Sequence, residues 1–420
     1  MKYTNLLCAA ILSPLGLLAC SGGEGSASSA TSGAPGTTSA SSSTSASASA
    51  SASSGGSTSS GGASAFPVDP ATGLRVSELG PVPALPEWPD NPPTEAKKTL
   101  GKALFSDRRL SGSGHIACGN CHLSFSSFQS AIALDLPDRS YPNLKPTLPR
   151  NTPSLLNIVY ATMLRWDGSY YTNLYETMVL PFAEANMNLT PGIPAEGVDA
   201  VDIPLAQKTL AHRLTVEAPG YVKVFQDAFD QDITKLAPED VWLLAGKALA
   251  VYIRVAVSRD SAFDKWNTGD DTAIEEDAIR GLELFRGKAR CVACHNGPLF
   301  TDYQFHNIST SLPGESGARA DEGRYKVTMK EEDRGAFLTP GLRGSSDTSP
   351  YFHTGTENAL SGVIRHLTTE AGIADPLHSP VLNGIDKLSD AEITDLVAFL
   401  KTLRGAPLPP ADLQLPKMLP

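Results

Sequence analysis

The sequence has no surplus of basic residues. Its 420 residues include 34 Lys and Arg against 45 Asp and Glu, which gives a formal net charge of −11. The charges are spread without long blocks of one sign, so the basic footprint of a nucleic-acid-binding protein is missing. We therefore expect no nucleic-acid partner. A positively charged protein partner is compatible with this charge but is not required by it.

Sustained alternation of apolar and polar residues, the pattern of half-buried strands, is also missing. Apolar residues instead recur at helical spacing in several segments. The last of these begins at Ser389, where Glu392 completes a capping box, and ends at Gly405. The sequence therefore predicts an all-α protein with little sheet. The clearest predicted helices span residues 93–105, 238–257, 272–285 and 389–404.

The N-terminus lacks an apolar run long enough to span a bilayer. Residues 1–20 have a basic start and a short apolar stretch, which indicates a signal peptide. They end in Leu-Leu-Ala-Cys20, which resembles a bacterial lipobox, so Cys20 is the predicted lipidated N-terminus. Ser21 in place of Asp favours the outer membrane, and several acyl chains provide stable anchoring. Ordinary secretion with cleavage elsewhere is the alternative.

Charge and large apolar residues are nearly absent from the segment that follows. Residues 21–64 are almost entirely Ser, Ala, Gly and Thr, with Glu24 as the one charge, and they cannot bury a core. Residues 66–92 are rich in proline and are expected to be extended. We therefore predict that residues 21–92 form a low-complexity and Pro-rich linker. Its Ser/Ala/Gly part is a disordered tether, and its Pro-rich part leads into a globular region.

Cysteine is scarce, and its placement is informative. Two of the six cysteines, Cys8 and Cys20, lie in the predicted signal segment, so no disulfide framework remains. The pattern Cys-X-X-Cys-His is the attachment signature of c-type haem: two thiols bind the vinyl groups and the His binds the iron. The sequence therefore predicts two covalent haems, attached outside the cytoplasm. The predicted attachment residues are Cys118, Cys121 and His122 for the first haem and Cys291, Cys294 and His295 for the second.

A weak internal repeat accompanies the two haem motifs. A helix ending in Phe precedes each motif, as Leu100–Phe105 before the first and Gly281–Phe285 before the second. Glycine in such a helix lets another helix cross closely, and the 389–404 helix is the expected partner of the 272–285 helix. We therefore predict two cytochrome c-like haem domains packed together, over residues 93–262 and 263–415.

Further short segments surround both motifs, and together they are far more specific than the haem signature alone. The chain resembles the bacterial di-haem cytochrome c peroxidases and the related MauG-type di-haem oxidases over residues 95–405. The segments that carry the resemblance are Leu100–Lys102, Asp107–Gly114, Arg150–Leu155, Trp166–Gly168, Asn296–Pro298, Phe305–Asn307, Gly335–Phe337, Thr339-Pro340 and Pro350–His353 with Gly355.

The resemblance implies that peroxide reacts at the haem on His122, while the haem on His295 relays electrons. It also places Trp166 between the two haems, although a buried core aromatic is the alternative interpretation of that residue. Hydrogen peroxide is then the expected substrate, and a small cytochrome c or a cupredoxin is the expected electron donor. In the MauG-type alternative, the oxidising power acts on a Trp or Tyr of a partner protein. A non-enzymatic electron-transfer cytochrome is the third hypothesis.

The resemblance further implies a calcium ion between the haem domains. Its ligands match the side chain of Asn151 and the backbone carbonyls of Thr348 and Pro350. Oxygen donors from distant segments suit such a hard cation. An asparagine cap and a plain turn are the alternative interpretation.

The first departure from the family pattern concerns activation. Peroxidases that need reductive activation carry a His in the loop after the first haem, and Asn143 stands at about that position here. No His lies between His122 and His212. This favours a first haem that is open without activation, as in the MauG-type enzymes.

The second departure concerns the sixth ligand of the second haem. The family has Met or Tyr there, but the matching residue is Leu367, which cannot bind iron. His366 is adjacent and is the candidate replacement ligand; a His that only lies beside the haem is the alternative.

The third departure lies in the distal pocket of the first haem. The family has a Glu that moves a proton on bound peroxide, and Asn186 stands at that position. Glu184 and Glu176 are the candidate substitutes, because a carboxylate near a haem can act as general acid and base. Solvated helix residues are the alternative. The expected location is the periplasm, with membrane contact through a lipid anchor only, and a homodimer is left open.

Overall fold

The computed structural model describes residues 66–138, 147–169, 173–189, 202–314, 316, 319–414, 416 and 419. By its contacts the chain divides into Met1–Gly62 and Ala63–Pro420, and the first unit lies outside the described residues. The predicted signal peptide and the Ser-rich tether therefore lie outside the described residues. Asn143 lies outside them as well, in the gap between residues 138 and 147. No described helix is both long and apolar enough to cross a membrane.

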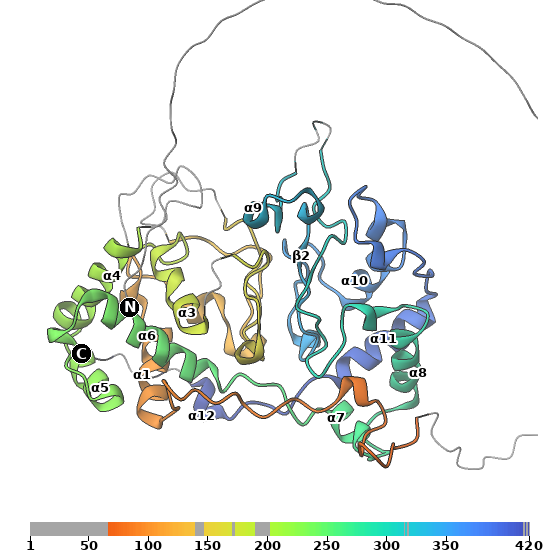
Figure 1. Cartoon of the computed structure of the whole chain (residues 1–420), viewed down its shortest axis with the longest axis horizontal. Helices are drawn as coiled ribbons and strands as arrows, with labels where there is room; N and C mark the ends of the chain where they lie inside the picture. The colour runs from red at the N-terminus through yellow and green to blue at the C-terminus, as the bar shows by residue number, and fades with distance from the viewer. Residues whose placement is uncertain are drawn as a thin grey trace, which may run out of the picture. The chain divides into compact units, whose positions relative to one another are not determined.

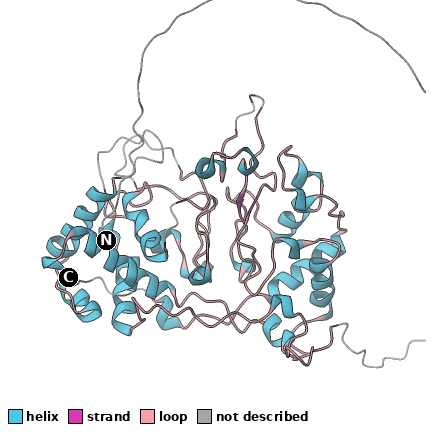
Figure 2. Ribbon diagram, in the orientation of Figure 1, coloured by secondary structure: helices cyan, strands magenta, loops and turns pink. Residues whose placement is uncertain are grey.

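The described part of the chain is built mainly from helices joined by long loops, as Figure 2 shows. The helices are α1 (Glu95–Ser106), α2 (Cys118–Cys121), α3 (Leu174–Ala183), α4 (Ile203–His212), α5 (Gly220–Phe229), α6 (Pro238–Ile253), α7 (Ala262–Asn267), α8 (Glu276–Arg286), α9 (Tyr325–Thr328), α10 (Leu360–Leu367), α11 (Asp390–Thr402) and α12 (Pro410–Leu413). Two short strands, β1 (Phe305–His306) and β2 (Phe337–Leu338), pair antiparallel. The prediction of a mainly helical protein with little sheet is confirmed.

The four predicted helices are α1, α6, α8 and α11, and side-chain caps open two of them. Thr94 caps α1 by accepting a hydrogen bond from the backbone N–H of Lys97. The predicted capping box of Ser389 and Glu392 opens α11. Helix α8 begins four residues later than predicted, at Glu276.

Helix α6 ends at Ile253, four residues before the predicted end. Beyond Ile253 the backbone N–H groups of Val255 and Ala256 bond to the carbonyls three residues back, so the α-helical pattern stops. The backbone that follows is held by Asn157, which donates its N–H to the carbonyl of Ala256 and accepts the N–H of Ser258 on its side chain.

The first core is the set of buried residues gathered around α1, α3, α4, α5 and α6. Helices α1 and α6 lie side by side in it (Figure 1). A Cβ atom on Gly101 would lie 2.0 Å from the carbonyl oxygen of Ala248, so only glycine permits this crossing. One turn further on, the ring of Phe105 packs on those of Tyr252 (5.2 Å) and Phe128 (6.2 Å).

The second core is built in the same way around α8 and α11, which lie side by side in Figure 1. A Cβ atom on Gly281 would lie 2.0 Å from the carbonyl oxygen of Asp395. The ring of Phe285 packs on those of Phe399 (5.2 Å) and Phe300 (6.0 Å). The predicted crossing of the 272–285 and 389–404 segments is confirmed, and each core has the same glycine and aromatic arrangement.

The two ends of the described chain pack on these cores. Val76 and Leu79, within the predicted linker, are buried in the second core. Leu408 and Leu413, near the C-terminus, pack against the first core. The division into domains at residues 93, 262 and 415 stays a prediction.

Candidate functional site

The imidazole of His122 is held by the backbone that follows its motif. Its Nδ1 lies 2.9 Å from the carbonyl oxygen of Phe128, a residue with φ of +57° that turns this carbonyl back toward the ring. Burial lowers the pKa of His122, although the Phe128 carbonyl opposes this shift. A neutral ring whose Nδ1–H donates to a carbonyl has its lone pair on Nε2, which is the form that binds a metal.

The second motif repeats this geometry. The Nδ1 of His295 lies 2.9 Å from the carbonyl oxygen of Phe300, whose φ is +56°. Burial also lowers the pKa of His295. In both loops a buried phenylalanine has the left-handed backbone conformation. This conformation turns its carbonyl oxygen toward the histidine ring, and the hydrogen bond fixes the orientation of the ring. The predicted axial histidines are therefore both prepared for iron in the same manner.

The four motif cysteines lie beside these histidines as free, half-buried thiols. Burial raises the pKa of each to about 12, so the thiols are protonated at neutral pH. A thiol is the group that adds to a haem vinyl. The residues present thus fit covalent haem c at both motifs.

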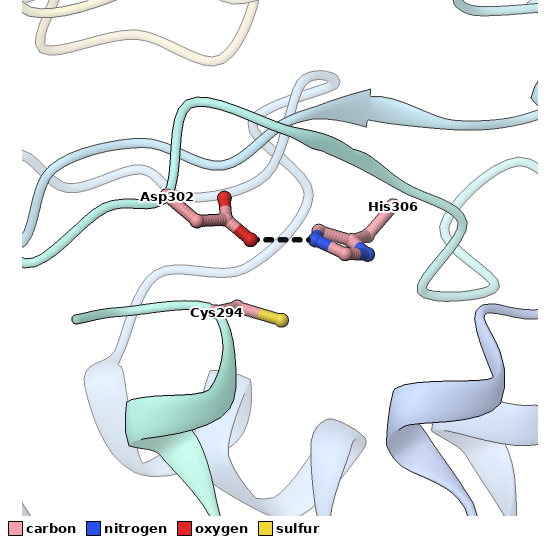
Figure 3. Close-up of side chains that lie close together, drawn as sticks. All are labelled: Cys294, Asp302 and His306. Atoms are coloured by element: carbon pink, nitrogen blue, oxygen red, sulfur yellow. Dashed lines mark hydrogen bonds and ion pairs between the residues drawn. The ribbon is translucent and has the colours of Figure 1, made fainter.

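Figure 3 shows Cys294 beside the pair formed by Asp302 and His306. Their ligand atoms lie within 4.8 Å of one another, and this is the one such grouping of His, Cys and carboxylate in the described part of the chain. The Nε2 of His306 lies 2.9 Å from Asp302, and its Nδ1 lies 3.0 Å from the hydroxyl of Ser379. Because Cys294 is a predicted haem-attachment residue and both ring nitrogens of His306 have protein partners, we assign no separate metal site here.

Trp166 lies at the contact between segments far apart in the sequence. Its indole N–H donates to the carbonyl of Asn151 (2.8 Å), and its own carbonyl accepts the N–H of Leu338 (2.8 Å). Its ring meets that of His353 edge-on at 6.5 Å, and His353 stacks on Phe337 at 3.7 Å. The bridging role of Trp166 stays a prediction, but its ring is held in one orientation by these contacts.

The sequence placed His353 only within a family segment, whereas the structure shows it buried beside Trp166 and Phe337. Its side chain is 2 % exposed, and its Nε2 has no hydrogen-bond partner within the described residues. Burial lowers its pKa to about 4, with Asp321 opposing and Arg150 reinforcing the shift. The ring is therefore neutral at physiological pH and is positioned by stacking rather than by charge.

Arg150 joins the Trp166 segment to a distant loop. Its guanidinium binds Asp321 through Nε (2.6 Å) and Nη2 (2.9 Å), and it binds Asp167 through Nη1 (2.7 Å). Burial opposes the charge of Arg150, but the two carboxylates outweigh it and raise the pKa. The sequence placed Arg150 only within a family segment, and nothing local in the sequence indicated the pairing with Asp321.

The structure places the two candidate distal carboxylates on α3. Glu184 caps its C-terminal end and forms an ion pair with Arg165 at 2.8 Å. Glu176 lies in its first turn, where its backbone N–H donates to the side chain of Asn173. The ion pair occupies the Glu184 carboxylate, and the acid–base role of both residues stays a prediction.

His366 lies on α10 and is bound to protein atoms. Its Nε2 lies 2.7 Å from the carbonyl oxygen of Ile308, and its ring packs edge-on against Phe352 at 5.2 Å. The prediction that His366 replaces the missing sixth ligand remains a prediction; with Nε2 engaged in this way, only Nδ1 is left for another partner.

The three predicted calcium ligands meet at one place, around a residue that the sequence did not single out. The side-chain Nε2 of Gln129 donates to the carbonyls of Thr348 (2.6 Å) and Pro350 (2.8 Å) and lies 3.2 Å from Oδ1 of Asn151. The oxygens converge as expected. The atom at their centre, however, is a hydrogen-bond donor, so this arrangement does not fit a cation at the same point.

Comparison with known proteins places this chain among haem peroxidases. Residues 95–272 match the family model described as di-haem cytochrome c peroxidase. The methylamine utilization protein MauG of Methylophilus methylotrophus is 35% identical over 337 residues, covering 80% of this chain and 89% of that protein. Cytochrome-c peroxidase IdrP1 of Denitromonas iodatirespirans is 33% identical over 352 residues, covering 77% and 86%.

A solved structure agrees with these relatives. The crystal structure of a MauG-like protein associated with microbial copper homeostasis matches with a TM-score of 0.64 at 27% identity. The match covers 80% of this chain and 97% of that one.

Proposed function

The chain belongs to the family of di-haem cytochrome c peroxidases and MauG proteins, and on this premise we propose that it reduces hydrogen peroxide at the His122 site with electrons relayed through the His295 site. It is accordingly a peroxide-dependent oxidoreductase that carries covalently bound haem c. Each motif, with its own core, forms one cytochrome c-like haem domain in this proposal.

The repeated proximal geometry is the observation that carries the proposal. Two neutral imidazoles, each fixed through Nδ1 by the carbonyl of a phenylalanine, present Nε2 for iron. Bound haem supplies the redox centre at which peroxide is reduced. The protein's own contribution is to orient the two imidazoles and to hold Trp166 rigidly in the segment between the motifs.

The MauG-like hypothesis, oxidation of a Trp or Tyr on a partner protein, remains the second candidate. It is favoured by the absence of a His between His122 and His212, because such a His would gate the first site. An electron-transfer cytochrome without catalysis is the third candidate, favoured by Asn186 at the expected Glu position. We place the protein in the periplasm, anchored through Cys20, with a small cytochrome c or cupredoxin as electron donor.

Peroxide should react with the fully ferric protein without prior reduction. The measurement is rapid-mixing absorption spectroscopy, paired with electron paramagnetic resonance of samples frozen after mixing. Loss of a high-spin ferric signal within the mixing experiment, followed by turnover with a reduced small cytochrome c, supports an open His122 site. Reaction only after one haem is reduced would indicate a gated site, and no reaction in either state would leave the electron-transfer hypothesis.

Replacing Trp166 by leucine should lower turnover with peroxide by about 100-fold, equivalent to about 2.7 kcal/mol in activation free energy. Leucine removes both the aromatic ring between the motifs and the N–H that binds Asn151. Steady-state turnover with a reduced cytochrome c is the measurement. Trp166→Phe, which keeps a ring, should lose less.

Trp88→Leu is the matched control, because Trp88 packs on Tyr175 and Arg254 rather than between the motifs. Absorption spectra of both variants verify that two haems are attached. Wild-type turnover in Trp166→Leu would remove the bridging role and leave Trp166 as a packing residue.

A further inference from the structure

Gln129 connects the loop after the first haem motif to a loop more than two hundred residues later. Its side chain is buried, with 7 % of the residue exposed, and its Nε2 contacts Thr348, Pro350 and Asn151. Beside it, the hydroxyl of Ser126 donates to the carbonyl of Asp347 at 3.2 Å. The loop that carries Gln129 is thus tied to residues 347–350 by side-chain donors.

The orientation of the Gln129 amide follows from its neighbours. Asn151 donates its Nδ2 to the carbonyls of Ala133 (2.9 Å) and Ile132 (3.3 Å), so its Oδ1 must face Gln129. The other two neighbours are backbone carbonyls. Three acceptors therefore surround one point, so the Gln129 amide must face them with its NH2 group and not with its oxygen. The two hydrogens of that group serve the carbonyls of Thr348 and Pro350, and Oδ1 of Asn151 at 3.2 Å is the weaker contact.

The same surroundings disfavour a divalent cation. Calcium needs six to eight oxygens at 2.3–2.6 Å and usually takes carboxylates among them. The three oxygens are fewer than calcium needs, and the group that lies among them is the donor end of the Gln129 amide rather than another oxygen. An ion at the centre would have to displace the Gln129 side chain, whose nitrogen already lies within hydrogen-bond distance of all three oxygens.

We propose that the side-chain amide of Gln129 takes the place of the calcium ion in this chain, as a covalently tethered, uncharged donor. The hydrogen bonds of Gln129 and Ser126 form a joint between the Gln129 loop and residues 347–350, and this joint then needs no metal ion. Gln129 directly follows Phe128, whose carbonyl holds His122, so the joint also fixes the loop that orients the first axial histidine. A chelator should leave both the joint and the His122 site unchanged.

The holoprotein as isolated should contain less than 0.1 equivalents of calcium, on the order of background, by elemental analysis. Its thermal unfolding midpoint, followed by circular dichroism, should shift by less than about 1 °C with excess EGTA or with millimolar calcium. The electron paramagnetic resonance spectrum of the ferric haems should be the same in both conditions. Stoichiometric calcium, with a lower midpoint and an altered spectrum after EGTA, would overturn the proposal and mean that Gln129 swings aside for an ion.

Gln129→Glu provides the converse test. A carboxylate facing three oxygens is destabilising without a counter-charge, so this variant should acquire calcium dependence that the wild type lacks. Calcium at about 100 times its dissociation constant should then raise the unfolding midpoint by roughly 5–10 °C. Gln207→Glu, which adds the same charge on α4, should show no calcium effect.

Gln129→Ala tests whether the amide donor stabilises the protein. Removing the amide leaves three buried acceptors without their donor, and the midpoint should fall on the order of 5 °C. A variant as stable as the wild type in EGTA would contradict the proposal. If Gln129→Glu does not fold, the calcium content and EGTA response of the wild type still test the proposal alone.

Discussion

Replacing Gly281 by valine is expected to disrupt the second core. A Cβ atom at this position would lie 2.0 Å from the carbonyl oxygen of Asp395 and 2.8 Å from Cβ of Phe399. Neither atom is the movable end of a side chain, so α8 and α11 would have to separate along their whole contact. Overpacking of a core costs about 1–3 kcal/mol and occasionally more, and this site lies at the upper end because neither atom can move aside. We expect either no folded holoprotein or an unfolding midpoint lowered by more than about 6 °C.

Glu283→Val is the control for Gly281→Val. Glu283 lies on the same helix with its side chain exposed, so this variant carries the helix cost of a β-branched residue without the steric conflict. Circular dichroism and the yield of haem-loaded protein are the measurements. A Gly281→Val protein as stable as Glu283→Val would show that α8 and α11 do not cross as closely as the structure has them.

The close helix crossings could be predicted because their signal is local and repeated. Gly101 stands four residues before Phe105, and Gly281 four residues before Phe285, each within a helical apolar pattern that precedes a haem motif. A glycine one turn before a large aromatic puts the open position and the packing residue on one helix face. The structure adds what the pattern lacks, namely α6 as the partner of α1 and the phenylalanines with positive φ that hold the predicted axial histidines.

The contacts of Gln129 and Arg150 with distant loops could not be predicted, because no periodicity encodes them. Only the family resemblance brought Asn151 together with Thr348 and Pro350. Gln129 and Thr348 are 219 residues apart, and Arg150 and Asp321 are 171 apart. Each is an ordinary polar residue in its own segment, and its partner becomes known only when the chain folds. The backbone after α6 is another such case, because its polar groups bond to the distant Asn157.

Replacing Arg150 by methionine is expected to lower the stability of the protein by about 3–5 kcal/mol, because it leaves two buried carboxylates without their partner. The side chains of Asp167 and Asp321 are each 11 % exposed. The unfolding midpoint should fall by roughly 6–15 °C at neutral pH. Arg365→Met is the control: its ion pair with Asp390 is exposed and should contribute less than about 1 kcal/mol.

The pH dependence of the stability lost in Arg150→Met shows whether Arg150 stabilises the protein through its charge or through the packing of its side chain. Burial alone would raise the pKa of Asp321, but the hydrogen bonds and charge of Arg150 outweigh burial and lower the pKa to about 2. Because the unfolded value is about 3.9, this carboxylate's contribution to stability is complete above about pH 4 and is lost as the pH falls through 2. In Arg150→Met only the N–H of Gly323 and the more distant charge of Lys326 still oppose burial at Asp321. The difference in midpoint from the wild type should therefore be largest near neutral pH and should narrow between pH 4 and pH 2. A difference that stays constant over this range would mean that Arg150 stabilises the Trp166 segment through its packed side chain, and that the two aspartates contribute little through their charge.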